Sequence, residues 1–194
     1  MSEKDNIPHK VTDPSPHSVP AGLQELIRDC LAQNRMAQKK LYDQYAPFIY
    51  GIIKRYVYNG GQADEILNDS FYKILTGLHG YAFKGSFEGW MRRIVINTIT
   101  DNFRKYIKKE PAYKVDIETT DVHVDGEVAG RMGYKELLKL IHQLPDTQRA
   151  VFNLFVFEQY SHKEIADHLG INENNSRWHL NDARKRLKEK ITSM

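Results

Sequence analysis

The segment from Ser161 to Arg186, SHKEIADHLGINENNSRWHLNDARKR, constrains the fold most, because it encodes two helices separated by a sharp turn. Ser161 with Glu164 three residues later forms a capping box, which predicts where the first helix begins. Gly170 predicts its end, since glycine readily adopts the left-handed conformation that a tight reversal requires. Asn172 can then cap the second helix. The pattern is that of a helix-turn-helix.

The second helix of this pair is predicted to have one buried face and one basic face. Its buried stripe is marked by apolar residues at helical spacing, Leu180, Ala183, Leu187 and Ile191. Most of the positions between them hold polar and basic residues, Arg177, Asn181, Arg184, Lys185, Lys188 and Lys190. A basic helix in this setting is typical of nucleic-acid binding, and the alternative is a helical hairpin with a solvated charged face.

Composition predicts an all-α protein of two small helical domains joined by a flexible acidic linker. The 194 residues can form two modest cores, and the aliphatic residues follow helical rather than alternating periodicity. The net charge of +3 is segregated, since residues 84–109 carry seven Lys and Arg against two acids and residues 110–130 carry one Lys against six acids. We expect a disordered, proline-containing leader over 1–20, domains over 21–109 and 133–194, and the linker over 110–132.

Cys30 is the only cysteine, so an intramolecular disulfide is excluded, and we interpret Cys30 as a small helix-packing residue. The N-terminus lacks the apolar core of a signal peptide, and no stretch approaches the roughly 20 apolar residues of a membrane span. We therefore expect a cytoplasmic protein without membrane insertion.

The first domain is predicted to contain two amphipathic helices before its basic one. Apolar residues from 41 to 57 follow one helical face, and Pro47 predicts a kink or a fresh start near Ala46. A second helix over 63–78 has an acidic face made of Asp64, Glu65, Asn68 and Asp69. These side chains either complement the helix dipole or form a docking patch for a positively charged partner.

A third helix is predicted to begin after Ser86, with an apolar stripe that includes Trp90 and a basic opposite side. Basic side chains along a helix can follow a phosphate backbone. The preceding loop, residues 79–85, contains Tyr81 and Phe83 between glycines. Aromatic side chains beside cations can stack on unpaired bases, and the alternative is that both rings pack in the core.

The order of these features resembles that of an extracytoplasmic-function sigma factor, the compact two-domain class of bacterial RNA polymerase specificity subunits. The resemblance covers about residues 25–191. The stretches that carry it are ADEILNDSFYKIL at 63–75, the spacing W-x6-N-x3-D-x2-RK across 90–105, LPDTQRAVFNLFVFEQYSHKEIADHLGI at 144–171, and the closing LNDARKRLKEKI.

The resemblance implies partners and site residues. The partners would be promoter DNA and core RNA polymerase, through the largest-subunit coiled coil and the flap, together with an inhibitory anti-sigma protein. The polymerase-binding residues would be Asp64, Glu65, Asn68 and Asp69. The −10 element would be held by Tyr81, Phe83, Lys84, Arg92, Arg93, Asn97, Arg104 and Lys105. The −35 element would be contacted by Asn174, Asn175, Arg177, Trp178, Asn181, Asp182 and Lys185.

The recognition helix departs from the family pattern in two places. Asn174-Asn175-Ser176 stands where many relatives have Gly-Thr-Val, and Asp182 replaces a common arginine, so we expect a different promoter sequence. By the groove code, Arg177 could pair with guanine, Asn181 with adenine and Asp182 with cytosine. Trp178 could contact a thymine methyl group or cover a sugar.

Two other function classes compete with that of a sigma factor. An autonomous helix-turn-helix regulator would bind a palindrome as a dimer and would need no polymerase. A metal-dependent nuclease would use Asp64, Glu65 and Asp69, but adjacent helical residues face different directions and no histidine lies at ligand spacing nearby. We therefore expect no enzyme activity, no catalytic or metal-binding residue and no cofactor.

Overall fold

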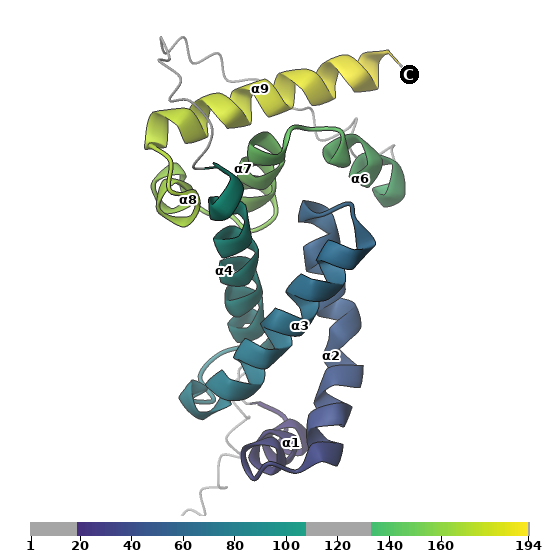
Figure 1. The fold of residues 1–194 in the computed structure, drawn as a ribbon, viewed down its shortest axis with the longest axis vertical. Helices are drawn as coiled ribbons and strands as arrows, with labels where there is room; N and C mark the ends of the chain where they lie inside the picture. The colour runs from purple at the N-terminus through teal and green to yellow at the C-terminus, as the bar shows by residue number, and fades with distance from the viewer. Residues whose placement is uncertain (1–18, 108–132, 194) are drawn as a thin grey trace, which may run out of the picture.

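The computed structural model describes residues 19–107 and 133–193, and every regular element in these ranges is helical, which confirms the all-α prediction (Figure 1). The predicted linker and all but the last two residues of the predicted leader lie outside the described residues. The elements are α1 (Ala21–Leu31), α2 (Arg35–Tyr56), α3 (Gly60–Gly77), a 3-10 turn (Leu78–Gly80), α4 (Phe87–Ile107), α6 (Tyr134–His142), α7 (Asp146–Val156), α8 (His162–Leu169) and α9 (Glu173–Thr192).

The N-terminal half, residues 19–107, is a bundle of α2, α3 and α4 with α1 packed across the foot of α2 (Figure 1). Asn34 and Asn59 cap α2 and α3 by accepting backbone N–H bonds in the first turn. The predicted stripe of α2 is buried, with Leu41, Ile49 and Ile53 inaccessible to solvent. Burial of this stripe stabilises the bundle by about 25 cal/mol per Å² of apolar surface removed from water.

Helix α2 runs through Pro47 without interruption, so a fresh start near Ala46 is wrong. Proline removes one backbone donor and crowds the preceding turn. The helix continues because apolar residues on both sides of Pro47, among them Tyr45 and Ile49, are buried in the same core. Tertiary packing therefore outweighs the local cost of the proline.

Helix α1 was not predicted from the sequence, although the interpretation of Cys30 is confirmed. Cys30 lies in α1 and is buried beside Leu26 and Ile27 in the core. Burial, together with the nearby Asp29 carboxylate, raises the pKa of its thiol, so Cys30 is a poor nucleophile in the folded protein.

The C-terminal half, residues 133–193, confirms the predicted helix-turn-helix. Ser161 and Glu164 form the reciprocal capping box at the start of α8. Gly170 ends α8 with φ of +69°, and the Asn172 side chain accepts the backbone N–H of Asn175 at 2.6 Å to begin α9. Helix α9 lies across the top of the molecule, packed on α7 and α8 (Figure 1).

The two halves meet along an interdomain seam, formed on one side by Lys54–Tyr56 of α2 with Arg92 and Arg104 of α4. The other side consists of His142, Arg149, Asn153, Glu158 and the C-terminal end of α8. Buried apolar residues of both halves belong to one contiguous cluster. The seam therefore fixes how the surfaces of the two halves are presented.

Candidate nucleic-acid interface

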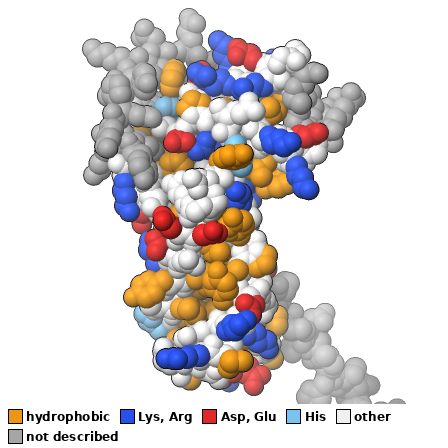
Figure 2. All heavy atoms as spheres, turned by 45° about the vertical axis from the view of Figure 1, so that its right-hand side comes forward, with side chains coloured by type: hydrophobic (Ala, Val, Ile, Leu, Met, Phe, Trp, Pro, Cys, Tyr) orange, Lys and Arg blue, Asp and Glu red, His pale blue; other side chains and the backbone are white. Residues whose placement is uncertain are grey.

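The acidic face of α3 is exposed, as an interaction surface requires. Asp64, Glu65, Asn68 and Asp69 all lie on the solvent side, while Ala63 and other apolar residues of the same helix are buried. Figure 2 shows acidic side chains grouped near the middle of the molecule, with apolar side chains exposed below them. Helix α3 begins at Gly60, so none of these carboxylates lies in its first turn, where a helix dipole acts, and the dipole interpretation is not supported.

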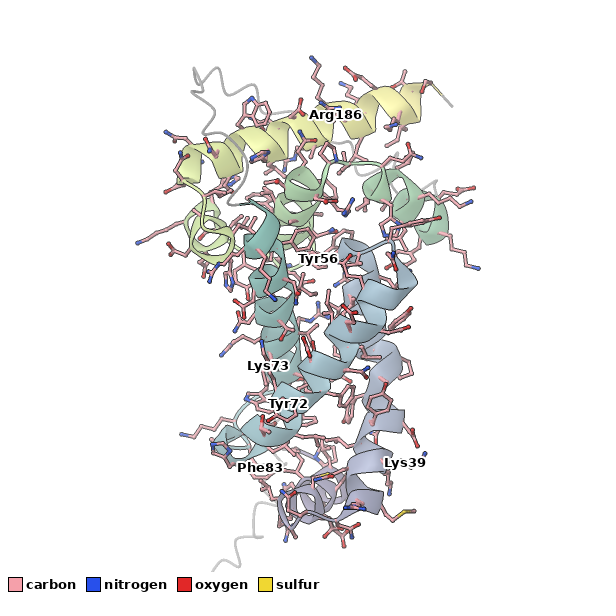
Figure 3. All side chains as sticks on the ribbon, in the orientation of Figure 1. Lys39, Tyr56, Tyr72, Lys73, Phe83 and Arg186 are labelled. Atoms are coloured by element: carbon pink, nitrogen blue, oxygen red, sulfur yellow. The ribbon has the colours of Figure 1, made fainter. Side chains whose placement is uncertain are left out.

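The loop before α4 contains two aromatic rings, one of which is buried and one exposed to solvent. Tyr81 is buried, donates its hydroxyl to the carbonyl oxygen of Gly85 at 2.9 Å, and packs against Phe87 and Trp90 with ring centroids 5.1 and 5.4 Å away. Phe83 is 38% exposed, with φ of +56°, and projects at the foot of the molecule (Figure 3). Packing therefore accounts for Tyr81, and Phe83 is the ring available for stacking.

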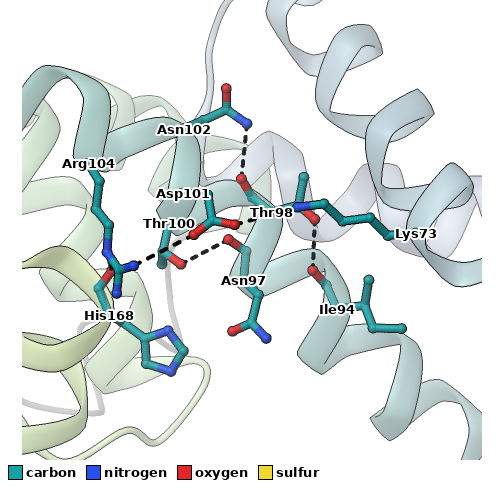
Figure 4. A network of polar contacts seen from close by, with 9 residues as sticks. All are labelled: Lys73, Ile94, Asn97, Thr98, Thr100, Asp101, Asn102, Arg104 and His168. Carbon is teal, nitrogen blue, oxygen red and sulfur yellow. Dashed lines mark hydrogen bonds and ion pairs between the residues drawn. The ribbon is translucent and has the colours of Figure 1, made fainter. Parts of the chain in front are cut away.

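Helix α4 carries a basic face, and one of its cations, Arg104, takes part in a polar network with Asp101 and with Lys73 of α3 (Figure 4). Arg93, Asn97 and Lys105 are exposed, and Lys84 is exposed in the preceding loop. Asp101 lies 3.5 Å from the Lys73 ammonium group and 3.7 Å from the Arg104 guanidinium. Exposed ion pairs of this kind contribute about 0–1 kcal/mol each. They therefore orient the side chains of this face, and breaking them when a nucleic acid binds would cost little.

Helix α9 presents a row of polar side chains to solvent. Asn174, Arg177 and Lys185 are exposed, and Trp178 and Asn181 are half-buried. These residues recur at spacings of three and four, which places them on one side of the helix. Arg177 donates to the Glu173 carboxylate at 2.5 Å, an exposed pair that a nucleic acid could displace at little cost.

Two residues expected in this row lie elsewhere. Asn175 is buried beneath the start of α9. Asp182 accepts hydrogen bonds from Gln148 of α7 at 2.5 Å and from Arg186 at 2.7 Å, so it faces the flank of the helix. Five residues correspond to about 140° around a helix, which explains why Asp182 does not share the side of Arg177. Asp182 therefore does not share with Arg177 one surface of α9 from which both could contact the −35 element, and that expectation is corrected.

Within the described ranges, no cluster of three or more His, Cys, Asp or Glu side chains could hold a metal ion. In the same part of the chain, the structure contains no helix with the length and apolar character of a membrane span.

Comparison with known families agrees with the arrangement of the two halves. A profile described as "Sigma-70 region 2" matches residues 41–108, and one described as "Sigma-70, region 4" matches residues 134–187. The chain belongs to the sigma-70 family. It is an RNA polymerase sigma factor of the extracytoplasmic-function class, which directs promoter-specific transcription initiation with core polymerase on promoter DNA.

Similar sigma factors extend over most of the chain. The RNA polymerase sigma factor HrpL of Pseudomonas syringae pv. syringae is 25% identical over 187 residues, covering 93% of each chain. The ECF RNA polymerase sigma factor SigM of Bacillus subtilis is 25% identical over 155 residues, covering 79% of this chain and 94% of SigM. The structure of CnrH in complex with the cytosolic domain of CnrY aligns over 88% of this chain and 97% of that chain, at 16% identity and a TM-score of 0.46.

Sequence reasoning missed the charged residues of the seam, Arg149 and Glu158. Arg149 follows Asp146, Thr147 and Gln148 in the quoted stretch, but Glu158 is the only charged residue from 151 to 160. That setting is a signal of burial with a partner, because an isolated charge is rarely buried unpaired. The partners of these residues across the seam lie 66 to 103 positions away along the chain, which a local pattern does not contain.

Proposed function

We propose that this sigma factor contacts the polymerase and the promoter through three separate surfaces. The acidic face of α3 docks on the coiled coil of the largest subunit, and the C-terminal half, 133–194, contacts the flap. The loop at 79–85 and the basic face of α4, within a domain over 21–109, hold the opened −10 strand. The outer row of α9 contacts the −35 element in the major groove, and residues 110–132 link the two domains.

The observation that carries this proposal is the segregation of charge by helix face. The acidic side chains of α3 and the polar row of α9 are exposed on different helices, and the loop with Phe83 lies at the opposite end of the molecule from α9 (Figure 3). A protein that bound only duplex DNA would have no evident use for an exposed acidic face, whereas a polymerase subunit needs a protein contact as well. The family resemblance adds an inhibitory anti-sigma protein as a proposed partner, and the cytoplasm as the proposed place of action.

Reversing two charges on α3 is expected to weaken polymerase binding about tenfold, because rim charges steer association and align the partner. The variant is Asp64→Lys with Asp69→Lys, and its affinity for core polymerase is measured by fluorescence anisotropy. The free energy of unfolding should change by only about 0.5 kcal/mol per site, since both positions are exposed.

The matched control makes the same change in charge on a different helix. Glu25→Lys with Asp29→Lys reverses two exposed carboxylates on α1 and should bind polymerase normally. Equal affinities for the two variants, with unchanged helicity in both, would contradict the docking surface.

Removing the exposed ring of the loop is expected to impair promoter opening. Phe83→Ala should reduce permanganate reactivity of the −10 region by a factor of about five, which corresponds to about 1 kcal/mol. This is the low end of the usual stacking range, because Tyr81 already contacts the Phe83 ring with centroids 5.2 Å apart. Tyr134→Ala removes another exposed aromatic ring, on α6, and should leave the footprint unchanged. A footprint of full intensity with Phe83→Ala would remove this residue from strand capture.

A further inference from the structure

The first turns of α8 and α9 are joined by a hydrogen bond between two side chains. The Nδ1 atom of His162, the first residue of α8, lies 2.9 Å from the hydroxyl oxygen of Ser176 in the first turn of α9. Ser176 is fully buried, so its hydroxyl group does not reach water. A buried hydroxyl group needs a partner, and His162 supplies one from the neighbouring helix.

A third helix holds the imidazole ring of His162 in place. This ring stacks on Phe155 of α7, with ring centroids 4.8 Å apart and planes inclined by 26°. On α9, the guanidinium of Arg184 lies over the same Phe155 ring, 5.5 Å from its centroid. His162 therefore stands where α7, α8 and α9 meet (Figure 1), and packing sets the orientation of its ring before DNA is present.

The surroundings of His162 keep its ring neutral at neutral pH. Burial lowers the pKa of His162, the Arg177 and Arg184 guanidinium groups lower that pKa further, and the Glu173 carboxylate acts in the opposite direction. A neutral imidazole can accept a hydroxyl proton at Nδ1 or donate its own. The contact with Ser176 is therefore a hydrogen bond between neutral groups, and salt screens it little.

Ser176 lies between two residues of the row that is proposed to contact the −35 element. Asn174 and Arg177 are exposed on the outer side of α9, whereas the Ser176 side chain is buried on the inner side. The bond to His162 therefore fixes the start of α9 at the point from which both exposed side chains extend. A side chain that reads a base edge must be held within about 0.5 Å of its productive position. Freedom in the first turn of α9 would weaken base reading even where the helix stays folded.

We propose that His162 is a positioning residue for −35 recognition, which aligns the reading side chains of α9 through its hydrogen bond to Ser176. This proposal rests on the proposed −35 role of α9. His162 acts on base preference without touching a base, and it leaves the phosphate contact expected of Lys188, three turns further along α9, unchanged.

A promoter-library selection with the full chain and core polymerase tests the alignment. His162→Phe keeps a ring against Phe155 but cannot bind Ser176, and it should lower the preference at the base pair read by Arg177 about fivefold. His162→Asn loses the ring but places an amide atom where Nδ1 stood, because both atoms are attached to Cγ. The asparagine variant should keep that preference to within about twofold of the wild type, since its amide can accept or donate the same hydrogen bond.

Stability should follow the opposite order, which separates alignment from packing. The midpoint of urea unfolding should be lower for His162→Asn, which loses the ring contact with Phe155, than for His162→Phe, in which the Ser176 hydroxyl group can turn to a carbonyl oxygen of its own helix. His168→Phe is the matched control in the same helix, because the His168 ring packs edge-on against Tyr160 instead, and it should keep the wild-type preference. A loss of preference that ran parallel to the loss of stability across these variants would overturn the positioning role.

Ser176→Ala removes the same hydrogen bond from the other side. It should lower the preference as His162→Phe does, and the double variant should show no further loss, because the two residues act through one contact. Additive losses, or an unchanged preference in Ser176→Ala, would contradict the proposal. The −35 role of α9 is tested separately by Arg177→Ala. A changed preference in that variant, together with a wild-type preference in His162→Phe and Ser176→Ala, would reject the positioning role alone.

Discussion

Arg149→Ala is expected to lower the free energy of unfolding by about 3–5 kcal/mol. The Arg149 side chain is 9% exposed and donates to the carbonyl oxygens of Tyr56 at 2.7 Å, Leu144 at 2.9 Å and His142 at 3.3 Å, as well as to the Asp146 carboxylate. Alanine would leave these buried carbonyl oxygens without a donor and would open a cavity beside α2. The cost is therefore larger than that of losing one surface ion pair.

The free energy of unfolding is measured by urea denaturation, which is monitored by circular dichroism. Arg186→Ala is the control, because it removes an arginine whose side chain is 50% exposed and whose ion pair with Asp182 is local. That control should change the free energy of unfolding by no more than about 0.5 kcal/mol. Arg149→Lys should lie between the two variants, since an ammonium group cannot reach all the acceptors of a planar guanidinium. A loss below about 1 kcal/mol for Arg149→Ala would show that water replaces the guanidinium readily.

Features fixed by short-range chemistry could be predicted from the sequence. The Ser161 capping box, the reversal at Gly170 and the cap at Asn172 each depend on residues within one helical turn. The apolar stripes of α2, α3, α4 and α9 depend only on helical periodicity. These local rules were sufficient for the fold class and for the helix-turn-helix.

Features fixed by contacts between distant segments could not be predicted. Pro47 predicted a kink or a fresh start in α2, and the fresh start is wrong because the residues on both sides of Pro47 are buried in one continuous helix. Tyr81 could be assigned to the core only once its neighbours were known. Asp182 carries a plausible base-reading side chain, yet Gln148 of α7 determines where it points. Pro47 and Asp182 are decided by packing against other helices, whereas Tyr81 contacts Gly85, Phe87 and Trp90, which are near in sequence but meet only in the folded loop.

The outer row of α9 leads to a second large expected effect, a change in −35 preference. Arg177→Ala should remove about 1–3 kcal/mol of discrimination at one base pair, because a bidentate arginine contact to guanine is lost. Lys188 lies three turns further along α9 and is exposed, where a phosphate is the expected contact. Lys188→Ala should weaken all promoters alike and reduce the salt dependence by roughly one phosphate.

A promoter-library selection with core polymerase separates these two roles in one assay. Asp182→Asn is the matched control, because it alters a side chain of the same helix that faces Gln148 and Arg186, and it should keep the wild-type preference at every position. Asp182→Asn could instead change the preferred −35 base while Arg177→Ala did not. In that case the flank of α9 that carries Asp182 would have to face the bases. That result would move the recognition surface toward α7 and would require Asp182 to leave its present partners when DNA binds. The prediction therefore tests the orientation of α9 as well as the identity of its reading residues.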